Sequence, residues 1–154
     1  MKNLNNYITE RLHITKQTSI YNYFPKTKDE LREILKERLK KDKNANLNDI
    51  DVSNIIDMSV LFWGLNAHDI DISNWDVSKV TNMSGMFNNC TQFNSDLSNW
   101  DVSKVNRMRY MFFDCGKFTG KGLDKWNPVN CTDMHEMFYK SPLENNPPEW
   151  YKNN

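Results

Sequence analysis

Carboxylates spaced at one fixed interval are the first side chains in this sequence that could do chemistry. Asp51, Asp76 and Asp101 recur every 25 residues, and Asp71 and Asp96 form a second series. Stacked copies would bring these like charges to about 4.8 Å, so their repulsion requires compensation. Calcium could supply it, and so could Asx-turns in which each carboxylate accepts backbone N–H groups beside a helix start. Because the sequence has no glycine-rich calcium-loop signature, the pattern favours structural capping.

The cysteines and histidines show no spacing that is typical of catalysis or metal binding. Cys90 and Cys115 lie 25 residues apart in one repeat position, and Cys131 takes a different position. There is no CxxC pair, and the three histidines are scattered with no serine or cysteine in a nucleophile motif. We therefore expect structural thiols, no catalytic residue, no cofactor and no metal site, and hence no enzyme.

Positions that differ between otherwise matched repeats are the best candidates for binding, since packing does not dictate them. Exposed aromatic residues combined with arginine are the composition of interface hot spots. For Trp63 and Tyr139 we favour a structural role instead, under the N-terminal helices and under a C-terminal lid. The candidate partner-binding residues are Arg107, Arg109, Tyr110, Phe113, Trp63 and Tyr139.

A repeat of about 25 residues must position all of these side chains. The segment 75–80, Trp-Asp-Val-Ser-Lys-Val, returns unchanged at 100–105, and four copies begin near Asp51, Asp76, Asp101 and Asn127. Repetition at such a period indicates stacked units, each unable to bury its apolar face alone.

Each repeat predicts a short strand followed by a short helix. In the second copy Val80, Met83, Phe87 and Cys90 have the spacing of one helix face, with Ser78 as the N-cap. The methionines keep strict register with phenylalanine and valine, which indicates core. The predicted fold class is α/β, a short right-handed leucine-rich-repeat-type solenoid of about four strand–helix repeats with an N-terminal helical cap.

Three regions follow from the repeat pattern. Residues 1–46 do not repeat and form the predicted helical cap, with helices over 3–13 and 28–42 and an extended segment over 19–24. A capping box from Thr27 to Glu30 predicts the start of the second helix. Residues 47–141 form the repeats, and residues 142–154 form a C-terminal lid that places its aromatic side chains on the last repeat.

The segment from Phe93 to Cys115 resembles the repeat of about 26 residues in BspA-like leucine-rich-repeat proteins, which include bacterial surface proteins and lipoproteins. The likeness extends over about residues 47–141, and the chain resembles short phage or mobile-element members without an export signal. The resemblance implies a leucine-rich-repeat fold and protein binding or adhesion, without catalysis.

Charge and hydropathy indicate the cellular compartment in which we expect the protein. The chain has 20 basic and 20 acidic residues, but residues 1–46 carry a net charge of +5 and residues 47–154 a net charge of −5. The N-terminus is polar, and no run approaches the roughly 20 apolar residues of a membrane span. We expect a soluble protein in the cytoplasm of a bacterial host, with reduced thiols and no membrane partner.

These observations predict a non-enzymatic protein-binding module. Its most concrete form is a phage or mobile-element inhibitor that binds and masks a host protein, such as a CRISPR-type nuclease complex. One alternative is a surface adhesion module, and another is a nucleic-acid binder that uses the basic cap. Lysines alternate with acidic residues over 33–43, which favours a solvated helix face over nucleic acid. Self-association through the exposed aromatic residues stays open.

Overall fold

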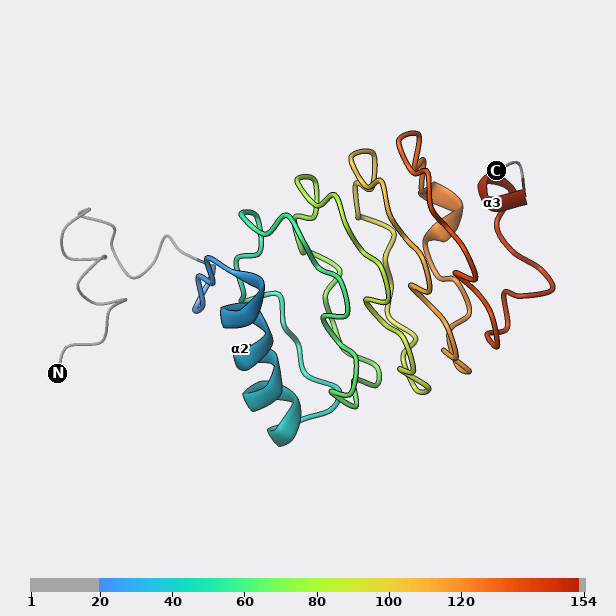
Figure 1. Ribbon diagram of the computed structural model, residues 1–154. Coiled ribbons are helices and arrows are strands. Elements are labelled where there is room, and N and C mark those ends of the chain that lie inside the picture. The colour runs from blue at the N-terminus through green and yellow to red at the C-terminus, as the bar shows by residue number, and fades with distance from the viewer. Residues whose placement is uncertain (1–19, 153–154) are drawn as a thin grey trace, which may run out of the picture.

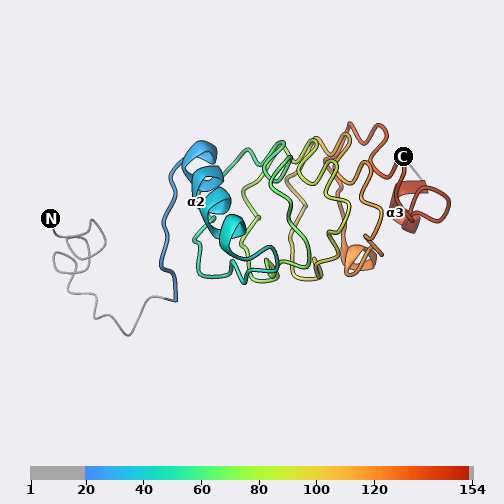
Figure 2. The same ribbon diagram turned by 90° about the horizontal axis from the view of Figure 1, so that it is seen from below.

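The computed structural model describes residues 20–152 and shows a chain wound into a row of stacked coils (Figure 1). Successive repeats lie side by side in sequence order, as the view from below also shows (Figure 2). Helix α2 (Lys28–Lys41) lies at the N-terminal end of the row, and the short helix α3 (Glu149–Lys152) lies at the C-terminal end. The 3-10 helix η1 (Leu123–Lys125) lies between the third and fourth coils.

Helix α2 begins where the sequence predicts it. The Thr27 hydroxyl accepts a hydrogen bond from the N–H of Glu30, and the Glu30 carboxylate accepts one from the N–H of Lys26. These bonds satisfy N–H groups that have no partner within the helix. Leu31, Leu35 and Leu39 are buried against the first coil. The other predicted cap helix, 3–13, lies outside the described residues.

The predicted α/β solenoid of strand–helix repeats is wrong. Between residues 20 and 152 the coils contain no α-helix and no continuous strand, and their ladder pairing consists of isolated parallel bridges. One series of bridges joins Asp57 to Asn82, Asn82 to Arg107, and Arg107 to Asp133. Each repeat is therefore a chain of turns, joined to its neighbours by isolated bridges and by further backbone hydrogen bonds between coils.

Backbone hydrogen bonding explains why the expected repeat helix does not form. The N–H groups of Met83 and Gly85 donate to the carbonyls of Arg107 and Arg109 in the next coil, at 2.9 and 2.8 Å, whereas Met86 donates to Met83 in its own coil. In an α-helix every N–H would bond four residues back, so donation to the next coil at alternate residues excludes it. Ser78 correspondingly caps no helix.

Left-handed backbone interrupts every repeat at the same two places. Gly85 and Asn89 have φ of 62° and 61°, and the equivalent residues of other repeats also have positive φ. A single left-handed residue ends a right-handed helix, so two of them within five residues leave only tight turns. The helical spacing of Val80, Met83 and Phe87 marks the buried side of these turns.

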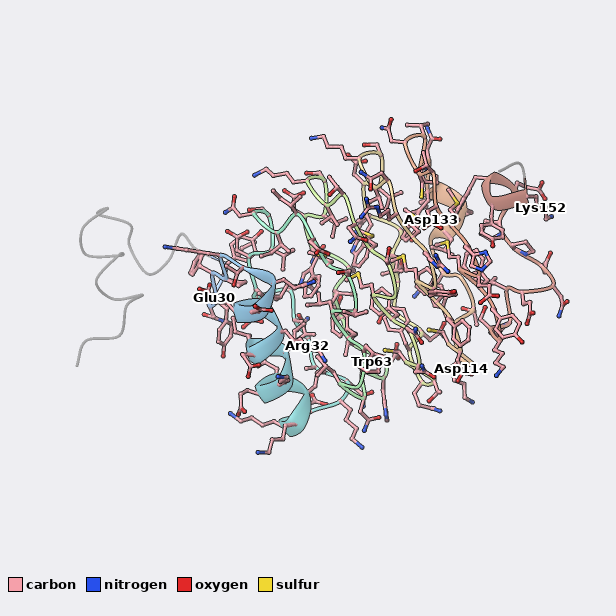
Figure 3. The ribbon with its side chains drawn as sticks, in the orientation of Figure 1. Glu30, Arg32, Trp63, Asp114, Asp133 and Lys152 are labelled. Atoms are coloured by element: carbon pink, nitrogen blue, oxygen red, sulfur yellow. The ribbon has the colours of Figure 1, made fainter. Side chains whose placement is uncertain are left out.

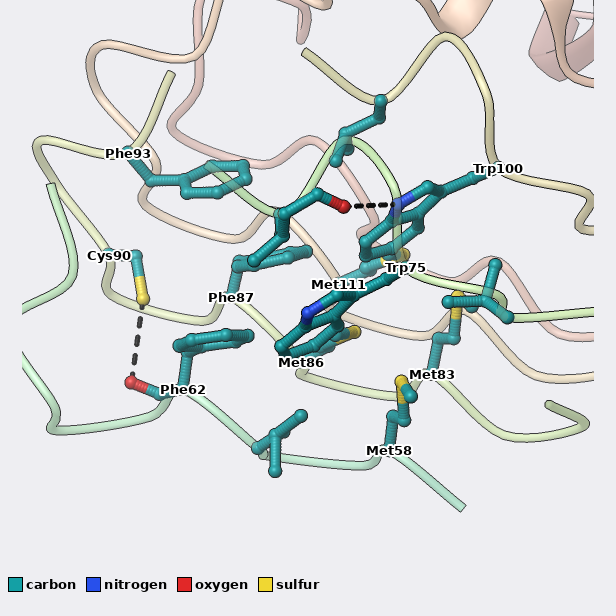
Figure 4. Packing of buried hydrophobic residues seen from close by; sticks show 14 of the residues in the cluster. Met58, Phe62, Trp75, Met83, Met86, Phe87, Cys90, Phe93, Trp100 and Met111 are labelled. Atoms are coloured by element: carbon teal, nitrogen blue, oxygen red, sulfur yellow. Dashed lines mark hydrogen bonds between the residues drawn. The ribbon is translucent and has the colours of Figure 1, made fainter. Parts of the chain in front are cut away.

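Ladders of equivalent side chains fill the interior of the stack (Figure 4). Trp75, Trp100 and Trp126 stack with ring centroids 6.5 and 6.3 Å apart, and Trp150 of α3 continues the ladder at 6.2 Å. Each indole N–H donates to a backbone carbonyl, as Trp100 does to Ile72 at 3.1 Å. The stacking places aromatic faces against each other with their polar edges satisfied.

The cysteine and methionine predictions are largely confirmed. Cys90 and Cys115 are buried, and the Cys90 thiol points to the Phe62 carbonyl at 3.6 Å (Figure 4). Of the methionines in the repeat pattern, only Met134 in the last coil is half-buried, because no further repeat covers it. The fully buried ones are Met58, Met83, Met86, Met108, Met111 and Met137.

Candidate functional site

The outward turns, residues 57–64, 82–89, 107–114 and 133–140, carry all the predicted partner-binding residues. Four rings from the third and fourth of these turns form one connected cluster, which we call the aromatic patch. Tyr110 meets Phe113 edge-on with centroids 5.7 Å apart, and Phe113 lies 5.2 Å from Tyr139. His135 meets Tyr110 edge-on at 5.8 Å.

Arg109 belongs to the same cluster. Its guanidinium lies 4.7 Å from the centroid of the Tyr110 ring and donates to the Tyr110 hydroxyl at 2.8 Å. This hydrogen bond raises the pKa of Arg109, and the carboxylates of Asp133 and Glu136 act in the same direction. An exposed cation on the half-buried Tyr110 ring gives the patch both a charge and an apolar face.

Arg107 lies at the bridge position of the third coil and is exposed. In the neighbouring coils Asn82 and Asp133 use this position to accept the N–H of the residue two further on. An arginine side chain has no acceptor, so Arg107 cannot make that turn-stabilising bond. Its presence here is not explained by folding.

Backbone conformation gives a second reason to treat Tyr110 as functional. Its φ is 57°, and the equivalent residue of the second coil is Gly85 with φ of 62°. A side chain in this conformation costs roughly 1–2 kcal/mol compared with glycine. Val60 and Glu136 occupy the same left-handed position in the first and fourth coils, so what distinguishes Tyr110 is the set of rings and the guanidinium that its own ring contacts.

Trp63 and Tyr139 are exposed, although we expected the N-terminal helices and the C-terminal lid to cover them. Trp63 is 53% exposed beside α2 (Figure 3), where the Arg32 guanidinium donates to its backbone carbonyl. Tyr139 is 41% exposed and packs on Phe113, with the Lys140 ammonium 5.6 Å from its ring. The aromatic patch therefore includes Tyr139, whereas the second coil separates it from Trp63.

His135 is the patch residue that the sequence prediction missed. It falls in the repeat position of Ser84 and Arg109, on an outward turn, and it is exposed. Its position one repeat after Arg109 could have indicated contact with Tyr110, because equivalent residues of adjacent coils are neighbours.

The aspartate ladders form Asx-turns, as predicted. Asp76 and Asp101 accept the N–H groups of Ser78 and Ser103 at 3.1 and 3.0 Å, and Asp51, Asp71 and Asp96 make the same bond. Hydrogen bonding by the serine side chain and backbone lowers the pKa of Asp76 and of Asp101. Over residues 20–152 no cluster of three or more histidine, cysteine or acidic side chains is arranged to hold a metal.

The thiols are poor nucleophiles. Burial raises the pKa of Cys90 to about 12, and burial likewise raises the pKa of Cys115 and Cys131. Because the thiolate is the reactive form, such cysteines behave as small apolar groups.

None of the helices in the described part of the chain combines the length and the apolar character that crossing a bilayer requires.

Comparison with known proteins identifies one family. The model of the family described as "Mycoplasma protein of unknown function, DUF285" matches residues 29–150, from α2 through the coils to the start of α3. No curated protein and no solved structure matches the chain.

Proposed function

Since the chain belongs to this DUF285 family of unknown function, we propose a function from its surface: a non-enzymatic module that binds another protein through the aromatic patch. The carrying observation is the connected cluster of rings on the third and fourth outward turns, with Tyr110 at its centre. Around it gather Phe113, Tyr139, His135 and Arg109. Tyrosine and arginine at the centre of an exposed cluster are typical of interface hot spots.

The rest of the stack supports a binding role. The ladders of buried tryptophan and phenylalanine hold adjacent coils in register, so the patch is built on rigid neighbours. A preorganised surface loses little conformational entropy when it binds.

The test is affinity capture from a lysate of the native host, followed by binding measurements with the purified partner. We expect Arg107→Glu/Tyr110→Ala/Phe113→Ala to weaken binding at least about 100-fold, which corresponds to about 2.7 kcal/mol. A control variant, Lys104→Glu/Gln92→Ala, changes exposed residues of the third and second coils away from the patch and should bind as the wild type does. Equal binding by both variants, with both folded, would overturn the patch as the site.

The more specific form of the proposal is an inhibitor, carried by a phage or mobile element, that masks a host defence nuclease in the bacterial cytoplasm. It is supported by the net charge of −5 over residues 47–154, an acidic surface of the kind that imitates nucleic acid. Co-expression with a panel of defence nucleases tests it. Undiminished activity across the panel would end this form of the proposal and leave the binding module standing.

A surface adhesion module is the second candidate, favoured by the resemblance of residues 47–141 to BspA-like surface repeats. The two candidates differ in where the native protein resides. Protease treatment of intact cells would remove the protein from the outer surface and leave an intracellular protein whole.

A further inference from the structure

The stack of coils has two chemically different ends, because the hydrogen bonds between outward turns all run in one direction. Each turn donates from alternate N–H groups to carbonyls of the next turn along the chain. Tyr110 and Phe112, for example, donate to His135 and Met137 at 3.0 and 2.9 Å. The first outward turn therefore presents unused carbonyls at the N-terminal end, and the last presents unused N–H groups at the C-terminal end.

Helix α2 closes the N-terminal end. The Arg32 guanidinium donates to the carbonyls of Val60, Leu61 and Trp63 at 2.9, 2.5 and 2.7 Å. Lys28 contacts the Asp57 carboxylate in the same turn. One arginine thus replaces the donors of a preceding coil.

The C-terminal end is closed only in part. The N–H of Lys140 donates to the Glu144 carboxylate at 3.0 Å, and Tyr151 contacts the Met134 carbonyl through its hydroxyl. The N–H groups of Met134 and Glu136 correspond to those of Met83 and Gly85, yet among residues 20–152 they find no acceptor. Unpaired N–H groups at the edge of a backbone ladder are a template for pairing with another chain.

A hollow lies beside this edge. It has a volume of about 530 Å³ and is lined by Cys131, Thr132, Met134, His135 and Tyr151. Met134 and Tyr151 contribute apolar surface, so the hollow can take a side chain of whatever pairs with the edge.

We propose that the edge formed by residues 133–137, together with this hollow, binds a peptide segment of a partner protein. The segment adds to the stack as a further coil and accepts hydrogen bonds from Met134 and Glu136 through alternate backbone carbonyls, a form of backbone augmentation. This site shares His135 with the aromatic patch, but it uses backbone N–H groups and needs neither the Tyr110 nor the Phe113 ring.

Charge and geometry select a polypeptide over the other occupants. The carboxylates of Asp133 and Glu136 belong to the same turn as the free N–H groups, which disfavours a phosphate or other anion relative to a neutral carbonyl. A second copy approaching with the same end would oppose donors to donors. A second copy approaching with its other end would meet α2, whose Arg32 already occupies the carbonyls.

The test uses the full chain and amide hydrogen exchange measured by NMR. In the free protein, the amides of Met134 and Glu136 should exchange rapidly, while those of Met83 and Gly85 should be protected. The probe is an acetylated and amidated peptide of residues 132–140, since this sequence already supplies the acceptor carbonyls for the preceding coil. At saturation it should slow exchange at Met134 and Glu136 by at least about tenfold.

Modified peptides identify the contact. In one peptide, the amides that carry the Asp133 and His135 carbonyls are replaced with trans-alkenes, and this peptide should no longer slow amide exchange in the protein. A peptide with one alkene, at the intervening Met134 carbonyl, should still slow it. Tyr110→Ala/Phe113→Ala should bind the peptide normally, which separates this site from the proposed function.

Three results would overturn the proposal. One is an unchanged exchange rate with millimolar intact peptide, and another is equal protection by the doubly substituted peptide. The third is protection of Met134 and Glu136 in the free protein together with the mass of a dimer, which would assign the edge to a second copy.

Discussion

Asp76 and Asp101 show how single polar side chains shape this protein. Each carboxylate holds a tight turn by accepting the N–H of a serine two residues on. Asp51 makes the same bond in the first coil, whereas in the fourth coil the Val129 N–H donates to the backbone carbonyl of Asn127.

The depressed pKa of these aspartates predicts a pH dependence of stability. Hydrogen bonds from Ser78 and Ser103 lower the pKa of Asp76 and Asp101 below the ordinary 3.8. A carboxylate with a lowered pKa in the folded state stabilises it above the ordinary pKa, and this contribution is lost as the pH falls through the folded pKa. The unfolding free energy should therefore decrease from about pH 5 to pH 2, measured by urea denaturation.

Asp76→Asn/Asp101→Asn should flatten part of this profile and remain folded, because asparagine can make the same turn, as Asn82 does. The control Asp69→Asn/Asp124→Asn replaces exposed aspartates outside these turns. Its unfolding free energy should fall more steeply between about pH 5 and pH 2 than that of Asp76→Asn/Asp101→Asn. Equal flattening by both variants would show that general charge repulsion causes the pH dependence.

Trp100 combines stacking with a buried hydrogen bond, and two substitutions separate these contributions. Trp100→Phe keeps an aromatic ring but leaves the Ile72 carbonyl without its indole donor, so we expect a loss of about 1–3 kcal/mol. Trp100→Ala also removes the stacked ring and should lose about 3–5 kcal/mol. Denaturant unfolding measures both. A loss with alanine but none with phenylalanine would assign the stability to packing alone.

The left-handed backbone at Val60 and Tyr110 predicts that glycine would raise stability at both positions and weaken binding only at Tyr110. Both have positive φ, where Gly85 stands in the second coil. Val60→Gly and Tyr110→Gly should each raise the unfolding free energy by about 1 kcal/mol. Only Tyr110→Gly should weaken binding to the partner captured through the aromatic patch. A destabilised Tyr110→Gly would mean that the contacts of its ring outweigh the backbone strain.

At the scale of elements, α2 acts as a cap through one side chain. Arg32 satisfies three carbonyls of the first outward turn, so Arg32→Met should cost about 2 kcal/mol while keeping the apolar stem. The control Lys36→Met removes an exposed ion pair with Glu33 and should cost under about 1 kcal/mol. Thermal or urea unfolding compares them. Equal costs would show that the leucines of α2 close the end without Arg32.

At the scale of the whole molecule, each coil contacts mainly its neighbours, and the chain can lose a complete repeat without losing register. Deleting residues 76–100 joins Trp75 to Asp101, which restores a sequence already present in the chain. We expect this variant to unfold cooperatively at a lower urea midpoint, because one coil of core is gone.

Deleting only residues 76–88 removes fewer residues but leaves about half of one repeat, which is too short to form a full coil. This control should lose cooperative unfolding. If the shorter deletion proved the more stable one, the stack would not be organised by whole repeats.

The amino-acid sequence by itself determined the period, most of the buried residues, the start of α2 and the Asx-turns. Each depends on side chains that recur every 25 residues or on bonds between residues close in the chain. The burial of Cys90 and Cys115 follows from the same recurrence.

Only the tertiary structure decided what the backbone does within each repeat. Val80, Met83 and Phe87 have helical spacing, yet alternate N–H groups bond to the next coil and replace the bonds of a helix. The same stacking brought His135 to Tyr110 and left the N–H groups of Met134 and Glu136 without an acceptor among residues 20–152. Such contacts join residues about 25 positions apart, and no local pattern shows which backbone groups will find partners across that distance.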